Sequence, residues 1–183
     1  MTFRTLEGGV STRGGVSELP HDRSEMLWSE AGPSVMLVES IDRWVGSMLA
    51  DERGGGDGPE VRIEAELISK SSGVLCGNSA VERLLESHFP DCSAQWFIEE
   101  GGEVSPGVCV AVLLGPARSL LRLERILLNL IGRMSGIATN TSQWCLSAGS
   151  LQVAATRKTA WGLLDKWAIH LSLIHISEPT RPY

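Results

Sequence analysis

Residues 115–139, GPARSLLRLERILLNLIGRMSGIAT, form the stretch that decides how the rest of the chain is organised. Pro116 suits the first turn of a helix, because its missing N–H would be unpaired there and its φ is already helical. The residues after it are rich in Leu, Ile and Met, which have high helix propensity. We therefore predict a helix that begins near Pro116, continues over residues 137–146 and ends at the Ala-Gly-Ser turn of residues 148–150.

Cations interrupt this apolar stretch at regular positions. One stripe of the predicted helix carries Arg122, Arg125, Asn129 and Arg133 at helical spacing. The apolar residues beside the stripe are predicted to be buried: Leu121, Leu127, Leu128, Ile131 and Met134. The stripe is either an ordinary solvated face or a binding surface for anions, and the pattern alone leaves both interpretations open.

A second group of cations stands downstream. The segment Thr156, Arg157, Lys158, Thr159 directly follows a short strand-like run, LQVAA, at residues 151–155. In this order and at this separation, the segments LERILLNLIGRMSGIAT, TRKT and GLLDKWA resemble those of the quinolinate phosphoribosyltransferases, also called carboxylating nicotinate-nucleotide pyrophosphorylases. The resemblance covers about residues 68–170 and includes a looser match, SGVLCG, at residues 72–77.

The resemblance implies a reaction and a set of site residues. Members of this family join quinolinate to 5-phosphoribosyl-1-pyrophosphate with Mg²⁺, forming nicotinate mononucleotide, pyrophosphate and CO2 in NAD biosynthesis. Thr156, Arg157 and Lys158 are thereby expected to line the substrate pocket, with Arg157 and Lys158 as catalytic cations. Arg125 is expected to reach the pocket of a partner subunit, because family members pair head to tail as homodimers. The family's Mg²⁺ ligands have no counterpart in this sequence.

These residue types suit the implied substrates, both of which are anionic. The arginine fork binds a carboxylate through two hydrogen bonds, whereas lysine offers a compact charge. In a pocket shielded from water, such cations stabilise the charge that develops on the pyridine ring as a carboxylate leaves. The alternative interpretation is that Arg125, Thr156, Arg157 and Lys158 make ordinary structural contacts with acidic residues of the chain.

The implied fold is an α+β N-terminal domain with a small sheet and helices, followed by the first strand and helix of a truncated α/β barrel. Residues 156–159 would lie at the C-terminal end of that strand, where the active sites of such barrels gather. The helix of residues 162–168 would come next. Residues 171–183, LSLIHISEPTRPY, have no counterpart in the family and resemble a translated sequencing adapter, so we expect a non-native tail.

We therefore expect an inactive truncation of the family enzyme. The family's His-Arg pair, a later lysine, the carboxylates for Mg²⁺ and the phosphate-binding loops would follow residue 170. Two alternatives stay open. One is a non-catalytic, dimerising α+β fragment whose cations are structural. The other is a related phosphoribosyltransferase-like paralogue, either molybdenum-associated or nicotinate-using.

Composition disfavours several other classes of protein. A chain of 183 residues that is 43% hydrophobic can bury one ordinary core, or a small domain plus a fragment. A net charge of −6 argues against binding to nucleic acid or to an anionic membrane. Without an apolar run of about 18–20 residues or a signal-peptide core, we expect a cytoplasmic protein. The scattered cysteines indicate neither a zinc site nor disulfides: Cys76, Cys92, Cys109 and Cys145.

The remaining patterns divide the chain into five parts. Residues 1–33, rich in Gly, Ser and charge, are expected to be a mobile extension in which Trp28 docks locally. Residues 34–115 are expected to form the α+β domain, 116–150 the connecting helices, 151–170 the start of the barrel and 171–183 the tail.

Within the expected α+β domain, apolar spacing predicts a helix over residues 35–48 and strands at 61–67, 74–77, 95–98 and 108–114. Asn78 or Ser79 is the predicted N-cap of a second helix that ends before Pro90. The acidic residues of the following turn are expected to form a solvated loop rather than a metal or general-acid site: Glu99, Glu100 and Glu103.

Overall fold

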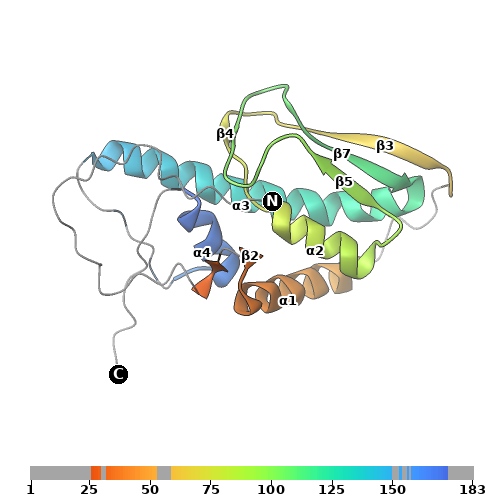
Figure 1. Ribbon diagram of the computed structural model, residues 1–183, viewed down its shortest axis with the longest axis horizontal. Helices are drawn as coiled ribbons and strands as arrows, with labels where there is room; N and C mark the ends of the chain where they lie inside the picture. Colours follow the sequence, from red (N-terminus) through yellow and green to blue (C-terminus); the bar gives the residue numbers. More distant parts are fainter. Residues whose placement is uncertain are drawn as a thin grey trace.

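The computed structural model of the chain describes residues 26–29, 32–52, 59–149, 153, 156 and 158–172. Within these residues the chain is a mixed α+β protein (Figure 1). The helices are α1 (Val35–Asp51), α2 (Asn78–His88), α3 (Ala117–Ala148) and α4 (Leu163–His170). The strands are β1 (Trp28–Ser29), β2 (Gly32–Pro33), β3 (Arg62–Ile68), β4 (Gly73–Val74), β5 (Ser93–Trp96), β6 (Glu103–Val104) and β7 (Cys109–Pro116).

A three-stranded antiparallel sheet has the order β3–β7–β5. The apolar strand β7 lies in the centre, as its nearly continuous run of apolar residues would suggest. The sequence of residues 61–67 predicts alternating faces. Ala65 and Leu67 are partly buried while Glu64 and Glu66 are exposed, as predicted, but Val61 and Ile63, expected on the same face as Ala65, are exposed. Two further pairs, β4–β6 and β1–β2, are short antiparallel ladders outside this sheet.

The predicted long helix is α3, which begins directly after Pro116 and ends before Gly149. Of the residues predicted to be buried beside its cationic stripe, Leu127, Ile131 and Met134 are buried. The prediction was wrong for Leu121 and Leu128, whose exposed fractions are 54% and 46%. Other elements pack on both sides of α3, the sheet on one side and the helices on the other, and neither layer buries these two leucines.

One hydrophobic core joins the helices to the inner face of the sheet. It contains residues from all four helices, among them Leu37 and Val45 of α1, Leu84 of α2 and Leu164 of α4. In Figure 1 the sheet lies on one side of α3, and α1 lies on the other side beyond α2. No helix in the described ranges is long and apolar enough to span a membrane.

The beginning of α2 differs from the sequence prediction. Gly77, at φ 117°, is the N-cap, rather than Asn78 or Ser79. The carboxylate of Glu100 accepts hydrogen bonds from the backbone N–H groups of Gly77 at 2.5 Å and of Ser79 at 2.9 Å. Glu100 therefore caps α2 and is not simply a solvated loop residue, because an anion at a helix N-terminus satisfies unpaired N–H groups.

Part of the expected N-terminal extension packs against the rest of the chain. Leu27 is buried, and the Trp28 ring stacks on Trp167 of α4 with 4.4 Å between centroids. This stacking confirms the predicted local docking of Trp28, and the mobility expected of residues 1–33 stays a prediction. The prediction that residues 171–183 form a tail without packing was wrong for Ser172, which is buried and donates from Oγ to the carbonyl of Ala138 at 2.5 Å. Residues 1–25, the tail from residue 173 onward, and all but Val153 of the predicted strand at 151–155 lie outside the described residues. The helix predicted after Gly162 is confirmed as α4.

Candidate anion-binding site

Arg125 lies on the outer side of α3 with its side chain 75% exposed. Its Nη1 is 3.3 Å from Oε2 of Glu52, whose side chain is 14% exposed. This contact uses one of the five N–H donors that a guanidinium carries. A surface ion pair of this kind contributes only about 0–1 kcal/mol to stability. The Arg125 fork thus remains largely available to an anion from outside the chain.

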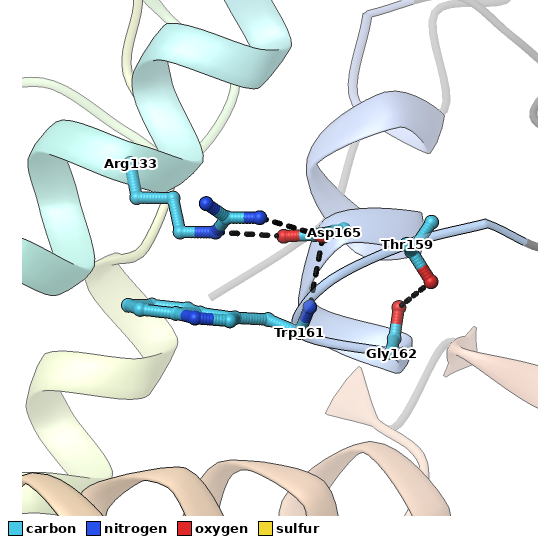
Figure 2. A network of polar contacts seen from close by, with 5 residues as sticks. All are labelled: Arg133, Thr159, Trp161, Gly162 and Asp165. Carbon is cyan, nitrogen blue, oxygen red and sulfur yellow. Dashed lines mark hydrogen bonds and ion pairs between the residues drawn. The ribbon is translucent and has the colours of Figure 1, made fainter.

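Arg133, two turns further along α3, is engaged differently. Its Nε and Nη2 donate to Oδ1 and Oδ2 of Asp165 at 3.0 and 2.8 Å, as Figure 2 shows. The Asp165 side chain is only 5% exposed, and the Arg133 guanidinium lies 4.7 Å from the centroid of the Trp161 ring. Within the predicted cationic stripe, Arg133 is therefore held by two hydrogen bonds to a buried carboxylate, whereas Arg125 makes one ion pair and stays exposed.

Sequence reasoning did not single out Asp165. The available signal was an acidic residue in the first turn of the helix that follows the second cationic segment, where a carboxylate is favoured. That position does not reveal the partner, because Arg133 is distant in sequence. Arg122, another member of the stripe, lies with Cζ 5.9 Å from the centroid of the Phe89 ring.

The second cationic segment lies next to α4. Thr156 and Lys158 are exposed, and the Lys158 backbone N–H donates to Oγ1 of Thr156 at 3.2 Å. Nζ of Lys166, in α4, donates to the backbone carbonyl of Thr156. Thr156 and Lys158 are thus exposed, while the Thr156 backbone is held to α4 by the hydrogen bond from Lys166. Arg157, predicted to act with them, lies outside the described residues.

The structure does not bring all the predicted site residues together. Thr156 and Lys158 are joined by a hydrogen bond, but no hydrogen bond or ion pair links either of them to Arg125 in the described part of the chain. Arg125 pairs with Glu52 of the α1 C-terminus, whereas Arg133, eight residues later on α3, pairs with Asp165 of α4.

The described residues do not provide a metal site. Among them there is no group of three or more His, Cys, Asp or Glu side chains placed to hold an ion. These residues therefore do not fit the Mg²⁺ that the family resemblance implies, and no chemical step is assigned to that ion here.

Residues 48–135 match the family model described as quinolinate phosphoribosyl transferase, N-terminal domain. This part of the chain belongs to that family. The matched region includes Arg125 and most of α3, and it stops before Thr156 and Lys158. The first cationic motif of the sequence analysis therefore lies within a recognised family domain, and the second lies outside it.

Relatives extend the similarity beyond that region. The chain is 38% identical over 112 residues to the chloroplastic carboxylating nicotinate-nucleotide pyrophosphorylase of Oryza sativa subsp. japonica, a match that covers 60% of this chain and 30% of that protein. It is 35% identical over 141 residues to a probable carboxylating nicotinate-nucleotide pyrophosphorylase of Synechocystis sp., covering 72% of this chain and 48% of that protein. The chain thus spans less than half the length of these relatives.

Solved structures agree on the fold. The nicotinate-nucleotide pyrophosphorylase of Francisella tularensis superimposes with a TM-score of 0.67 at 24% identity, covering 74% of this chain and 52% of that one. NadC from Streptococcus pyogenes superimposes with a TM-score of 0.68 at 22% identity, covering 79% of this chain and 55% of that one. The mixed α+β arrangement is therefore that of the N-terminal region of these proteins.

Proposed function

We propose that this chain is the N-terminal part of a quinolinate phosphoribosyltransferase and that it contributes cations to the binding of quinolinate, a pyridine dicarboxylate. The observation that carries the proposal is the exposure of Arg125 within the matched family domain. Arg83 and Arg133 each donate two hydrogen bonds to one aspartate, whereas Arg125 makes a single ion pair and its side chain stays exposed. The single ion pair with Glu52 thus leaves most N–H donors of this arginine without a partner among the described residues.

The proposed role of each cation follows from its chemistry. Arg125 and Arg157 would each hold a carboxylate through a planar two-donor fork, and Lys158 would add a compact positive charge. Thr156 would contribute a hydroxyl to the same pocket. In the reaction of the family, the pyridine nitrogen forms a bond to the ribose carbon as pyrophosphate leaves, and a carboxylate departs as CO2. Fixed cations favour that loss because they stabilise the negative charge left on the ring.

We further propose that two copies of the chain associate through the outer side of α3. Leu121, Arg125, Leu128, Gly132 and Gly136 recur there at helical spacing and are exposed. A Cβ atom added at Gly132 or Gly136 would meet nothing within 4 Å, so a second backbone could approach closely. Such a contact would carry Arg125 toward the second cationic segment of a partner, which would account for its separation from Lys158 within one chain.

The same exposed leucines favour a second candidate function, a dimerising α+β fragment without a substrate. Exposed apolar side chains that recur on one helix face are typical of an association surface and do not require a ligand. The two candidates differ in one respect: only the first demands that the cations recognise a dicarboxylate.

Calorimetric titration of the purified chain with quinolinate tests the proposal. We expect saturable binding that weakens by about tenfold in Lys158→Ala, the loss expected for one charge-assisted hydrogen bond. Lys70→Ala is the matched control, because Lys70 is an exposed lysine in the turn between β3 and β4. Absence of binding by the unmodified chain, or equal weakening by both substitutions, would favour the dimerising fragment.

A further inference from the structure

The Arg133–Asp165 pair is the centre of a network that extends beyond the two side chains. Besides the two hydrogen bonds from Arg133, Oδ2 of Asp165 accepts one from the backbone N–H of Trp161 at 2.9 Å. Figure 2 shows the carboxylate between the guanidinium and the Trp161 backbone, with the Trp161 ring beneath Arg133. The buried negative charge of Asp165 is therefore matched by a cation and by a backbone donor.

This network is continuous with the segment that carries the second group of cations. Trp161 lies between that segment and α4, and its ring also stacks on Trp44 of α1 at 5.1 Å between centroids. Oγ1 of Thr159 donates to the Gly162 carbonyl at 3.3 Å, and Nζ of Lys166 donates to the Thr156 carbonyl. The backbone from Thr156 to α4 is thus tied at several points around one buried carboxylate.

We propose that Arg133 and Asp165 are positioning residues, which set the place of Thr156 and Lys158 relative to α3. The inference rests on the proposed function, because that function requires both cationic motifs to act on one substrate. Arg125 and Arg133 lie on the same helix, eight residues apart. The Arg133–Asp165 pair therefore holds the segment of Thr156 and Lys158 against α3, the helix that carries Arg125. Both oxygens of Asp165 accept from Arg133, and Oδ2 also accepts from the Trp161 backbone, so this carboxylate is occupied by contacts within the chain.

A comparable ion pair elsewhere in the fold provides a control for stability. Arg83 of α2 donates from Nε and Nη2 to Asp42 of α1 at 2.8 and 2.9 Å, which is the same two-bond geometry. That pair joins two helices and makes no contact with the Thr156–Lys158 backbone among the interactions of the described residues. Its loss weakens helix packing without releasing the second cationic segment.

The experiment compares Asp165→Asn, Arg133→Lys and the control Asp42→Asn in the full chain. Arg133→Lys keeps the positive charge but loses the planar fork, and it serves if Asp165→Asn does not fold. Amide hydrogen exchange is measured at Lys158, whose N–H bonds to Thr156 and does not contact the pair. Quinolinate affinity and the denaturation midpoint are measured on the same samples.

We expect both substitutions at the pair to speed Lys158 exchange by about tenfold or more, since a released segment opens locally. Quinolinate Kd should rise by a similar factor, because small displacements of binding groups have large effects. Asp42→Asn should lower the midpoint and leave both other quantities unchanged.

A change in Lys158 exchange that is equal in all three variants, or absent from both Arg133→Lys and Asp165→Asn, would overturn the positioning role. If the unmodified chain does not bind quinolinate while exchange responds only at the Arg133–Asp165 pair, the proposed substrate is wrong and the positioning role stands. If quinolinate binds equally to the unmodified chain and Asp165→Asn, the positioning role is wrong and the proposed function stands.

Discussion

Glu100 closes the N-terminus of α2 from a separate turn, accepting hydrogen bonds from the backbone N–H groups of Gly77 at 2.5 Å and Ser79 at 2.9 Å. The Ser79 hydroxyl adds a third at 3.1 Å. The same turn is held by Nδ2 of Asn78, which donates to the Ile98 carbonyl at 3.0 Å. The Glu100 carboxylate therefore joins the turn after β5 to the N-terminus of α2, a helix that contributes buried residues to the core.

Replacing Glu100 should lower stability more than replacing its neighbour. Glu100→Ala leaves the N–H groups of Gly77 and Ser79 without their acceptor, which should lower the free energy of unfolding by about 1–3 kcal/mol. Glu99→Ala is the control, because Glu99 is exposed. Urea denaturation measures both. Equal midpoints for the two variants would show that Glu100 is only a solvated loop residue.

Two glycine substitutions should change the free energy of unfolding in opposite directions. A Cβ at Gly73 would lie 2.4 Å from Oγ1 of Thr139, which also accepts the Val74 backbone N–H at 2.9 Å. Gly73→Ala should therefore destabilise the fold by about 1–3 kcal/mol, the range for overpacking. At Gly46 in α1 nothing lies within 4 Å, so Gly46→Ala should stabilise by about 0.5–1 kcal/mol. Denaturation midpoints that shift in the same direction would contradict the packing of β4 against α3.

Acid should weaken the contact between α1 and α2. The hydrogen bonds from Arg83 lower the pKa of Asp42 below its ordinary value of 3.8. The unfolded chain therefore takes up this proton first as the pH falls. The stabilisation is complete above about pH 4 and is lost as the pH drops from there through the folded pKa. In a series of denaturation curves, the stability difference between the unmodified chain and Asp42→Asn should shrink below about pH 4. A difference that stays constant would contradict the pairing.

The sequence predicted those features whose signals are local. Pro116 and Gly149 mark the ends of α3, and the alternation around Ala65 marks the strand β3. The wrong predictions concern which side of a helix is buried by neighbouring elements. Leu121 and Leu128 fit an apolar stripe, but periodicity cannot tell whether a further chain lies over it, and within the described residues none covers it fully.

Contacts between distant charged residues could not be predicted either. Arg133 and Asp165 are 32 positions apart, and Gly77 and Glu100 are 23 apart. The sequence pattern around a charged residue on a helix or in a turn is the same whether that residue is solvated or forms an ion pair. Only the fold brings these partners within hydrogen-bond distance. For the candidate site, Arg125, Thr156, Arg157 and Lys158 stay a prediction from the sequence, which did not single out the Asp165 carboxylate that binds Arg133.

Substitution of Arg125 should separate quinolinate binding from folding. Because the Arg125–Glu52 pair is exposed on the arginine side, Arg125→Ala should change the free energy of unfolding by no more than about 1 kcal/mol. Arg118→Ala is the matched control, since Arg118 lies on the same helix in a surface pair with Glu60 at 3.5 Å. Arg125→Lys tests the need for the planar fork.

Quinolinate affinity of these three variants, measured by calorimetry beside their denaturation midpoints, is the most direct test of the central claim. We predict that Arg125→Ala weakens binding by about 1.5–3 kcal/mol, the range for a hydrogen bond to a charged group, with an unchanged midpoint. Arg125→Lys should recover part of that loss, and Arg118→Ala should bind as the unmodified chain does. An Arg125→Ala variant that unfolds early yet binds quinolinate normally would contradict the substrate-binding role of α3.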